Sequence, residues 1–220
     1  MTAAPPNAAA GAPPTDAPLA IASRAAPRLF LLGVTLGSAL DAIHVHTGTT
    51  SYTAPVLFGA AWWVPLEFGV AGIAVGLGRR FLERTFRAES PAPAAPLLWV
   101  GLGCFVAAYA VSGFFSARAW LDAVLLAAVF AGAWLACDRT RIGLLAAGLT
   151  AAIGVGVEVA MVRAGIFRYR APGVLGVADW LPLLYGSAAV GIGNLGKHWS
   201  APPVPTASSS SSGLTISAGA

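Results

Sequence analysis

The sequence predicts an all-α, polytopic integral membrane protein with six transmembrane helices. Hydrophobic residues make up 57% of the 220 residues. Charged residues make up 10%, against about 25% in ordinary globular domains. The mean hydropathy is +0.74. Membrane β-barrel strands would show alternation over about ten residues, which the sequence lacks. Because every backbone polar group needs an internal partner in lipid, long apolar runs fit only helices.

Six windows of the sequence are long and apolar enough to be spanning helices, which need about 20 mostly apolar residues. They cover 29–46, 54–78, 96–115, 119–137, 142–162 and 180–197. The chain therefore divides into three parts: a disordered Ala/Pro-rich tail at 1–28, a six-helix transmembrane domain at 29–199 and a disordered Ser-rich tail at 200–220. Pro65 and Pro182 each lie two residues after a tryptophan, where proline fits a helix start or a kink.

The distribution of basic residues predicts the orientation, because Lys and Arg concentrate in cytoplasmic segments next to the membrane. Four of the 13 basic residues fall on one side of a six-span topology: Arg118, Arg163, Arg168 and Arg170. The others fall on the opposite side: Arg24, Arg28, Arg79, Arg80, Arg84, Arg87, Arg139, Arg141 and Lys197. We therefore expect both termini in the cytoplasm. The net charge of +4 is an orientation signal and indicates no nucleic-acid partner.

Four polar residues stand out inside the predicted spans, where ionised groups usually face a cavity or a partner. Glu67 lies near the middle of the second span, and Glu158 lies toward the far end of the fifth. Asp41 and His44 share one face of the first span, at i and i+3. One interpretation is that they line a pocket and hydrogen-bond the hydroxyl group of a lipid. The alternative is that the two glutamates only bond neighbouring helices, which contributes about 0.6 kcal/mol each.

Other kinds of site are weaker interpretations of the same residues. A metal site from Asp41, His44 and His46 would need a ligand from another span, and His46 is turned away from the other two. We therefore expect no metal and no cofactor. Acid–base catalysis by Glu67, Glu158 and His44 on an isoprenoid or carotenoid is the main enzymatic alternative. A transporter would show broken helices related by a repeat, and the sequence shows neither.

Glycine spacing indicates close helix packing. Gly33 with Gly37, and Gly72 with Gly76, form GxxxG pairs that let two backbones approach. Gly154 belongs to a second group of glycines that keeps the last two spans slim. Slim helices also leave room for a groove that takes an acyl chain or a sterol, and this second interpretation stays open.

Several motifs occur in a fixed order over roughly 54–199. They are Ala61-Trp62-Trp63-Val64-Pro65 with Gly69, Asp138-Arg139-Thr140-Arg141 with Gly143, Gly165, Tyr169, Pro172, Trp180-Leu181-Pro182 and Gly193-Asn194-Leu195-Gly196-Lys197. This pattern resembles the Insig family of sterol-responsive membrane proteins of the eukaryotic endoplasmic reticulum. The resemblance implies an Insig-like six-helix bundle without enzymatic activity. It also implies a sterol or diacylglycerol-like lipid held among the central helices, and a role in lipid or sterol metabolism.

The polar residues of the spans and the resemblance together give two sets of site residues. The ligand-binding set is Glu158, Glu67, His44, Asp41, Val159 and Gly154. The partner-binding set is Asp138, Arg139 and Arg141, because the matching aspartate of the family engages the membrane protein Scap. Asp138 has a simpler role as well, since it can accept backbone N–H bonds at a helix start.

The chain also departs from the family pattern. Animal members carry a small uncharged residue at the position of Glu67 and a polar amide at that of Val159, so sterol specificity does not carry over. A single lysine beside many arginines favours a bacterial source. In that case the protein belongs in the cytoplasmic membrane, whereas a eukaryotic source would place it in the endoplasmic reticulum. Homo-oligomerisation stays open.

Overall fold

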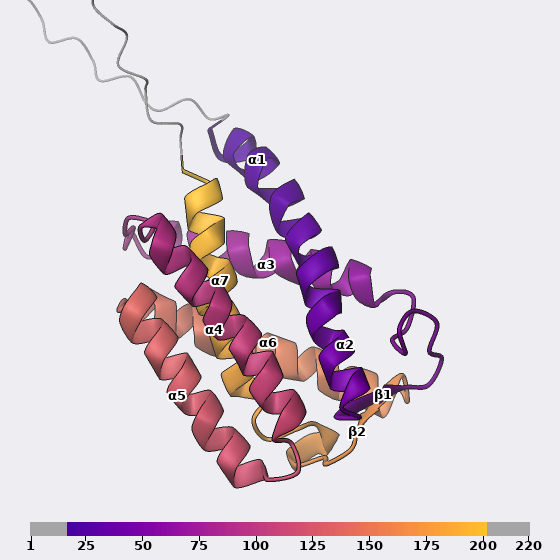
Figure 1. Cartoon of the computed structure of the whole chain (residues 1–220). Helices are drawn as coiled ribbons and strands as arrows, with labels where there is room; N and C mark the ends of the chain where they lie inside the picture. Colours follow the sequence, from indigo (N-terminus) through magenta and orange to yellow (C-terminus); the bar gives the residue numbers. More distant parts are fainter. Residues whose placement is uncertain (1–16, 202–220) are drawn as a thin grey trace, which may run out of the picture.

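Six long helical segments build the part of the chain that the computed structural model describes, residues 17–201 (Figure 1). The first consists of α1 (Ala17–Leu32), the π-helical turn η1 (Gly33–Gly37) and α2 (Ser38–His46). The others are α3 (Val64–Thr85), α4 (Ala95–Phe114), α5 (Ala119–Cys137), α6 (Arg141–Arg163) and α7 (Leu181–Trp199). Arg24–His46, α4, α5 and α6 are each long and apolar enough to cross a membrane. The predicted helical membrane architecture is therefore confirmed.

The second predicted span began too early. Residues 54–63 form a loop, and α3 begins at Val64. Within the loop, Phe58 and Gly59 have positive φ angles, and the amide of Val56 donates to the carbonyl of Ala60. Pro65 lies in the first turn of α3, where its missing N–H costs no helical hydrogen bond. Apolar composition alone could not separate this folded loop from the helix that follows it.

The predicted boundary of the N-terminal tail was also wrong. The tail was expected to reach residue 28, but α1 begins at Ala17 and contains Pro27. Alanine has the highest helix propensity, and five alanines lie between residues 17 and 26. The rest of this tail, 1–16, lies outside the described residues, as does nearly all of the C-terminal tail expected at 200–220.

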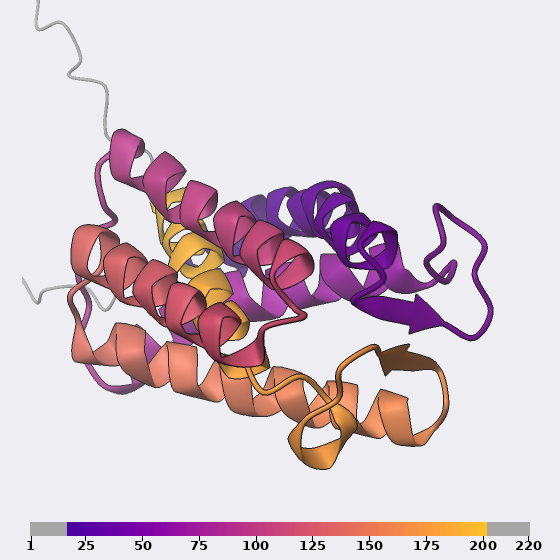
Figure 2. The same ribbon diagram turned by 60° about the horizontal axis from the view of Figure 1, so that its bottom comes forward.

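Helix α7 lies in the middle of the bundle, with other helices on several sides (Figure 2). It packs against α3, α4, α5 and α6, and every residue from Gly186 to Lys197 is buried. Its many small residues allow this central position. A Cβ atom added to Gly196 would lie 2.6 Å from the Cα of Gly76 on α3. The two backbones therefore approach too closely for any larger residue.

The GxxxG pairs lie where the first helical segment crosses α3. A Cβ atom on Gly33 would lie 2.9 Å from the Cα of Gly69. A Cβ atom on Gly72 would lie 2.6 Å from the carbonyl oxygen of Leu29. The predicted close packing is confirmed at this crossing. The π-helical turn falls at the same place, and such turns often occur at functional sites.

A short antiparallel ribbon was missed by the sequence analysis. Strand β1 (Thr50–Tyr52) pairs with β2 (Phe167–Tyr169), with Tyr52 opposite Phe167 and Thr50 opposite Tyr169. A short 3₁₀ turn, η2 (Val174–Gly176), follows β2. Side chains two apart in a strand share a face, so Tyr52 and Tyr169 lie on the same side of the ribbon. The ribbon thereby joins two loops that are distant in sequence and places both phenols over one end of the helices.

Candidate functional site

Three acidic side chains meet inside the bundle from three different helices. Asp41 lies on α2, Glu67 on α3 and Glu158 on α6. The three lie in the same region of the bundle as Tyr109 on α4, within the range over which a charge on one affects the others. Asp41 is buried, with 6% of its surface exposed. The structure thus brings together acidic residues that the sequence analysis proposed separately.

All four tyrosines of the chain surround this acidic cluster. The hydroxyl of Tyr52 donates to Oδ2 of Asp41 at 2.9 Å. Those of Tyr185 and Tyr169 donate to the two carboxyl oxygens of Glu158, the first at 2.6 Å. Burial and the nearby Asp41 raise the pKa of Tyr52 above its ordinary value, so this phenol remains a donor at neutral pH. Two of the three carboxyl groups therefore have phenol partners.

His44 is buried beside the cluster. Its Nε2 lies 2.8 Å from the hydroxyl of Ser112, and this hydroxyl donates to the carbonyl of Ala108 at 2.8 Å. Because the hydroxyl hydrogen is used there, Nε2 of His44 is the donor. The imidazole also stacks on Tyr109, with 4.8 Å between ring centroids, and meets the edge of Trp180. His44 is thus hydrogen-bonded to α4 through Ser112 and packs against the Tyr109 ring.

A narrow cavity of about 70 Å³ lies next to the acidic cluster. The cavity is lined by Leu32, Gly33, Leu36, Gly37, Phe68, Ala71, Gly72, Val75, Phe105, Tyr109, Leu184, Tyr185, Ala188 and Ile192. Of these, only Tyr109 and Tyr185 carry polar side chains, so the cavity is apolar with one phenolic end. Its volume is below the roughly 300–1,000 Å³ of typical small-molecule pockets.

The remaining predicted ligand residues occupy supporting positions. Gly154 lies under the ring of Tyr185, because an added Cβ would be 2.5 Å from that ring. Val159 belongs to the hydrophobic core. His46 is exposed, apart from Asp41 and His44. Within residues 17–201, no three His, Cys, Asp or Glu residues are placed to hold a metal ion.

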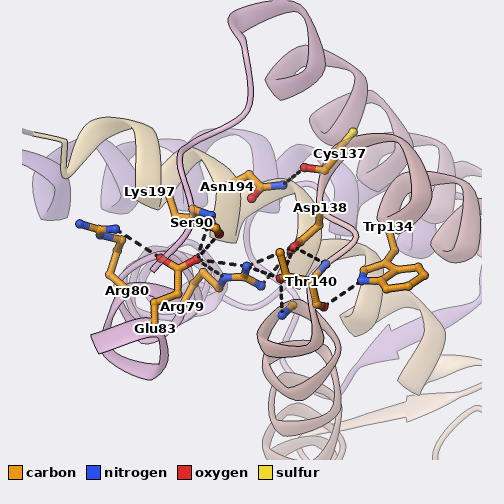
Figure 3. Close-up of polar contacts among 11 residues, drawn as sticks. Arg79, Arg80, Glu83, Ser90, Trp134, Cys137, Asp138, Thr140, Asn194 and Lys197 are labelled. Carbon is orange, nitrogen blue, oxygen red and sulfur yellow. Dashed lines mark hydrogen bonds and ion pairs between the residues drawn. The ribbon is translucent and has the colours of Figure 1, made fainter. Parts of the chain in front are cut away.

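A second buried polar cluster lies at the end of the bundle expected to be cytoplasmic (Figure 3). Arg79 binds Asp138 through both terminal nitrogens, at 2.9 and 3.1 Å, and also pairs with Glu83 at 3.2 Å. Lys197 lies 2.8 Å from Glu83 and donates to Ser90 at 2.7 Å. Burial raises the pKa of Glu83, but the hydrogen bond and charge of Lys197 and the charge of Arg79 outweigh it, so the pKa is lowered.

The predicted partner-binding turn belongs to this second cluster. The side chain of Asp138 is only 2% exposed, whereas Arg139 and Arg141 are exposed. Thr140 caps α6 by accepting a hydrogen bond from the amide of Gly143 at 3.0 Å. Asp138 therefore links the turn between α5 and α6 to α3 through its buried pair with Arg79. An open hollow of about 480 Å³ lies beside it, between residues 90–93 and 136–140.

Several residues of these clusters were not recognised from the sequence. Arg79 and Glu83 are spaced i, i+4, which is typical of a helical ion pair, but Arg79 was used only as an orientation signal. The tyrosines carried no signal of their own, because two lie in the short strands β1 and β2 and two lie in helices. Only the ribbon and the crossing of the helices bring them together.

Comparison with known proteins identifies the family. The zebrafish (Danio rerio) insulin-induced gene 1 protein is 30% identical over 77% of this chain and 70% of its own length. The Xenopus tropicalis insulin-induced gene 2 protein is 32% identical over 77% of this chain and 80% of its own length. The chain belongs to the Insig family. A scan against models of protein families finds no match.

Solved structures show the same Insig fold. The mycobacterial Insig homologue MvINS from Mycobacterium vanbaalenii is 29% identical, with a TM-score of 0.72 over 79% of this chain and 92% of the MvINS chain. A cross-linked trimer of an MvINS variant is 30% identical, with a TM-score of 0.73 over 80% and 93% of the two chains. The six-helix Insig architecture of the described residues is thereby shown.

Proposed function

We propose that this protein is a non-enzymatic Insig-like membrane protein that binds a sterol or diacylglycerol-like lipid inside the bundle. The observation that carries the proposal is the cavity with apolar walls and a phenolic end beside buried carboxyl groups. Membership of the Insig family supports it. A lipid head would lie at Tyr109 and Tyr185, and its chains would extend past the glycines of η1 and α3 toward the bilayer.

The proposed mechanism is selection by shape and by a few polar contacts. Gly33, Gly37 and Gly72 line the cavity, so the backbone itself forms part of the wall and a bulky ring or a chain can lie flat against it. Cavity polarity is confined to one end, which fixes the direction in which an amphipathic lipid enters. Since 70 Å³ is too small for a whole lipid, α3 and η1 must separate when a complete ligand binds.

We also propose that the exposed Arg139 and Arg141, beside the open hollow, form a docking surface for a membrane-protein partner. Asp138 would act there through the position it gives to the turn. In this proposal both termini lie in the cytoplasm and the protein regulates lipid metabolism through that partner. The mycobacterial relative was crystallised as a cross-linked trimer, and we propose a homo-oligomer for this chain as well.

The acidic cluster gives one reason to keep an enzyme as the second candidate, because paired carboxyl groups can exchange protons with an isoprenoid. That candidate predicts conversion of substrate, and it would be dropped if isoprenoid and carotenoid substrates stay unchanged after incubation with the purified protein.

Native mass spectrometry of the protein in gentle detergent tests lipid binding, with Glu158→Gln and Glu67→Gln measured in parallel. The expected result is one defined lipid per chain in the wild type and a loss of that lipid in at least one variant. Lipid-free protein in all three samples would contradict the proposal.

A further inference from the structure

The loop between β1 and α3 exposes an apolar surface. Residues 54–63 contain no charged, amide or hydroxyl side chain. Val56 and Trp62 are exposed, and Phe58 is 84% exposed. The loop extends away from the helices beside the start of α3 (Figure 1, Figure 2). Surface loops are ordinarily polar, and a contiguous exposed apolar patch marks contact with a protein or a membrane. The outer side of this loop therefore has the character of an interaction surface.

The inner side of the same loop is fixed against the bundle. Ala60, Ala61 and Val64 are buried together in a small core. Tyr52 of the ribbon and Phe68 of α3 pack against that core. The loop is thus a folded element with two apolar sides. Because the inner side is held in place, the outer side chains point in a fixed direction.

The tip of the loop is a tight turn that carries an unusual residue. The amide of Leu57 donates to the carbonyl of Ala60 at 3.0 Å, and the amide of Ala60 donates back at 2.9 Å. Between them, Phe58 and Gly59 have φ angles of 50° and 84°. Two-residue turns with positive φ at both central positions favour Asn and Gly, and a bulky residue is strained there. Since the exposed ring of Phe58 adds nothing to the turn, it indicates a contact outside the chain.

The lipid bilayer is the partner that fits this surface. Leu66 and Val70 are exposed on α3, so they face lipid in a membrane-spanning bundle. Trp62 precedes Leu66 by four residues, as Leu66 precedes Val70, and this spacing continues the lipid-facing stripe into the loop. No Asp, Glu, Lys or Arg occurs between Asp41 and Glu67, so the surface offers no charge to a polar partner. Tryptophan is also enriched where membranes meet water.

The backbone of the loop limits how deeply it inserts. The amides of Phe58 and Gly59 donate to no backbone carbonyl of the described residues. The hydrocarbon core does not tolerate irregular backbone that faces lipid. Head groups and their water, in contrast, supply acceptors for such amides. The backbone of the loop therefore belongs at the level of the head groups, with its side chains directed toward the acyl chains.

We propose that residues 54–63 form an interfacial anchor that inserts Val56, Phe58 and Trp62 into the boundary between head groups and acyl chains. Its partner is the lipid surface itself, whatever the charge of the head groups. The anchor fixes the depth at which α3 begins and, through Tyr52, holds the ribbon at the membrane surface. It is separate from the cavity inside the bundle and does not depend on a lipid being bound there.

Spin labels measure the depth of the loop in a bilayer. A nitroxide is attached at Phe58→Cys in the full-length chain carrying Cys104→Ala and Cys137→Ala, reconstituted in phosphatidylcholine vesicles. Power-saturation EPR compares access of oxygen, which dissolves in the bilayer, with access of a nickel chelate, which stays in water. The label is expected about 5–10 Å deep in the interface. Ser51→Cys is the control: Ser51 is exposed opposite Arg168 in the ribbon, and a label there should be open to the nickel chelate.

Each result decides for or against the anchor. Equal nickel-chelate access at the two positions would place the loop in water and overturn the proposal. Exclusion of both reagents from position 58 would also overturn it, because a second copy of the chain would then cover the loop. Vesicles with added phosphatidylglycerol should give the same depth, and a depth that depends on lipid charge would contradict an apolar anchor.

Two variants test the role of Phe58, with the label moved to Val56→Cys. Phe58→Asn suits the turn and removes the apolar ring, so the label should shift toward water. Phe58→Leu keeps an apolar side chain and should leave the label at its original depth. An unchanged depth in Phe58→Asn would exclude Phe58 as an anchoring residue.

Discussion

Arg79 on α3 donates hydrogen bonds from both terminal nitrogens of its guanidinium to Asp138, at 2.9 and 3.1 Å, although 59 residues separate the two in sequence. Both side chains are 2% exposed. The same guanidinium pairs with Glu83, which in turn binds Lys197 on α7. One arginine thus connects α3, α7 and the turn between α5 and α6. Such a bidentate, buried pair has a fixed geometry that a lysine could not reproduce.

Replacing Arg79 by methionine should destabilise the protein by about 3–5 kcal/mol, because Asp138 and Glu83 would stay buried with less compensation. Thermal unfolding in detergent, followed by circular dichroism, measures the loss. Arg84→Met is the matched control: its ion pair with Glu89 is long, at 3.9 Å, and exposed, so its loss should cost at most about 1 kcal/mol. Equal melting temperatures for the two variants would show that the buried pair stabilises nothing.

Stability should fall in acid because of Glu83. Its pKa in the folded protein is lowered by Lys197 and Arg79, which outweigh burial. A lowered pKa gives stabilisation that is complete above the ordinary carboxyl value of about 4.3 and is lost as the pH falls through the folded-state pKa. Unfolding measured from pH 7 to pH 3 should show this loss. Glu83→Gln should be less stable at pH 7 and lose less stability in acid. If the stability of the wild type and of Glu83→Gln fell equally with pH, the acid sensitivity would not come from Glu83.

Gly196→Ala should disrupt the contact between α7 and α3. The new Cβ would lie 2.6 Å from the Cα of Gly76, and backbone atoms cannot move aside as a side chain can. Overpacking of this kind costs about 1–3 kcal/mol. Gly132→Ala is the control, since an added Cβ there meets nothing within 4 Å and should stabilise α5 by roughly 0.5–1 kcal/mol. A Gly196→Ala variant as stable as the control would contradict the close approach of the two helices.

Ala71→Leu should block lipid binding without harming the fold. Ala71 is exposed on α3 and lines the cavity, so a larger side chain fills the mouth and buries no new polar group. Ala74→Leu, on an exposed position of the same helix outside the cavity lining, serves as the control. Native mass spectrometry should find lipid lost only in Ala71→Leu, with both variants unfolding within about 0.5 kcal/mol of the wild type. Lipid retained by both would place the ligand elsewhere.

The sequence predicted the number of helices well, because lipid demands long apolar runs and these are visible without any tertiary contact. Asp41 and His44 were also correctly placed on one face, since helical geometry alone determines it. The start of α3 was missed because loop 54–63 is as apolar as a helix. The meeting of Glu67, Glu158 and the tyrosines depends on how α2, α3, α4 and α6 cross. No local sequence pattern predicts such crossings. The ribbon that positions Tyr52 and Tyr169 has strands of only three residues each, too short to be recognised from sequence.

The central position of α7 has a consequence for biosynthesis. The helix that the other helices pack around comes last in chain order among the described helices. Until Lys197 arrives, Glu83 lacks one of its cations and the glycine faces of α3 and α4 lack their partner. Before α7 is inserted, the first five helical segments therefore lack their central packing partner and form a less stable assembly in the bilayer. Chains that stop before Leu181 should be recognised by membrane proteases as unassembled, and quality control of this protein depends on α7.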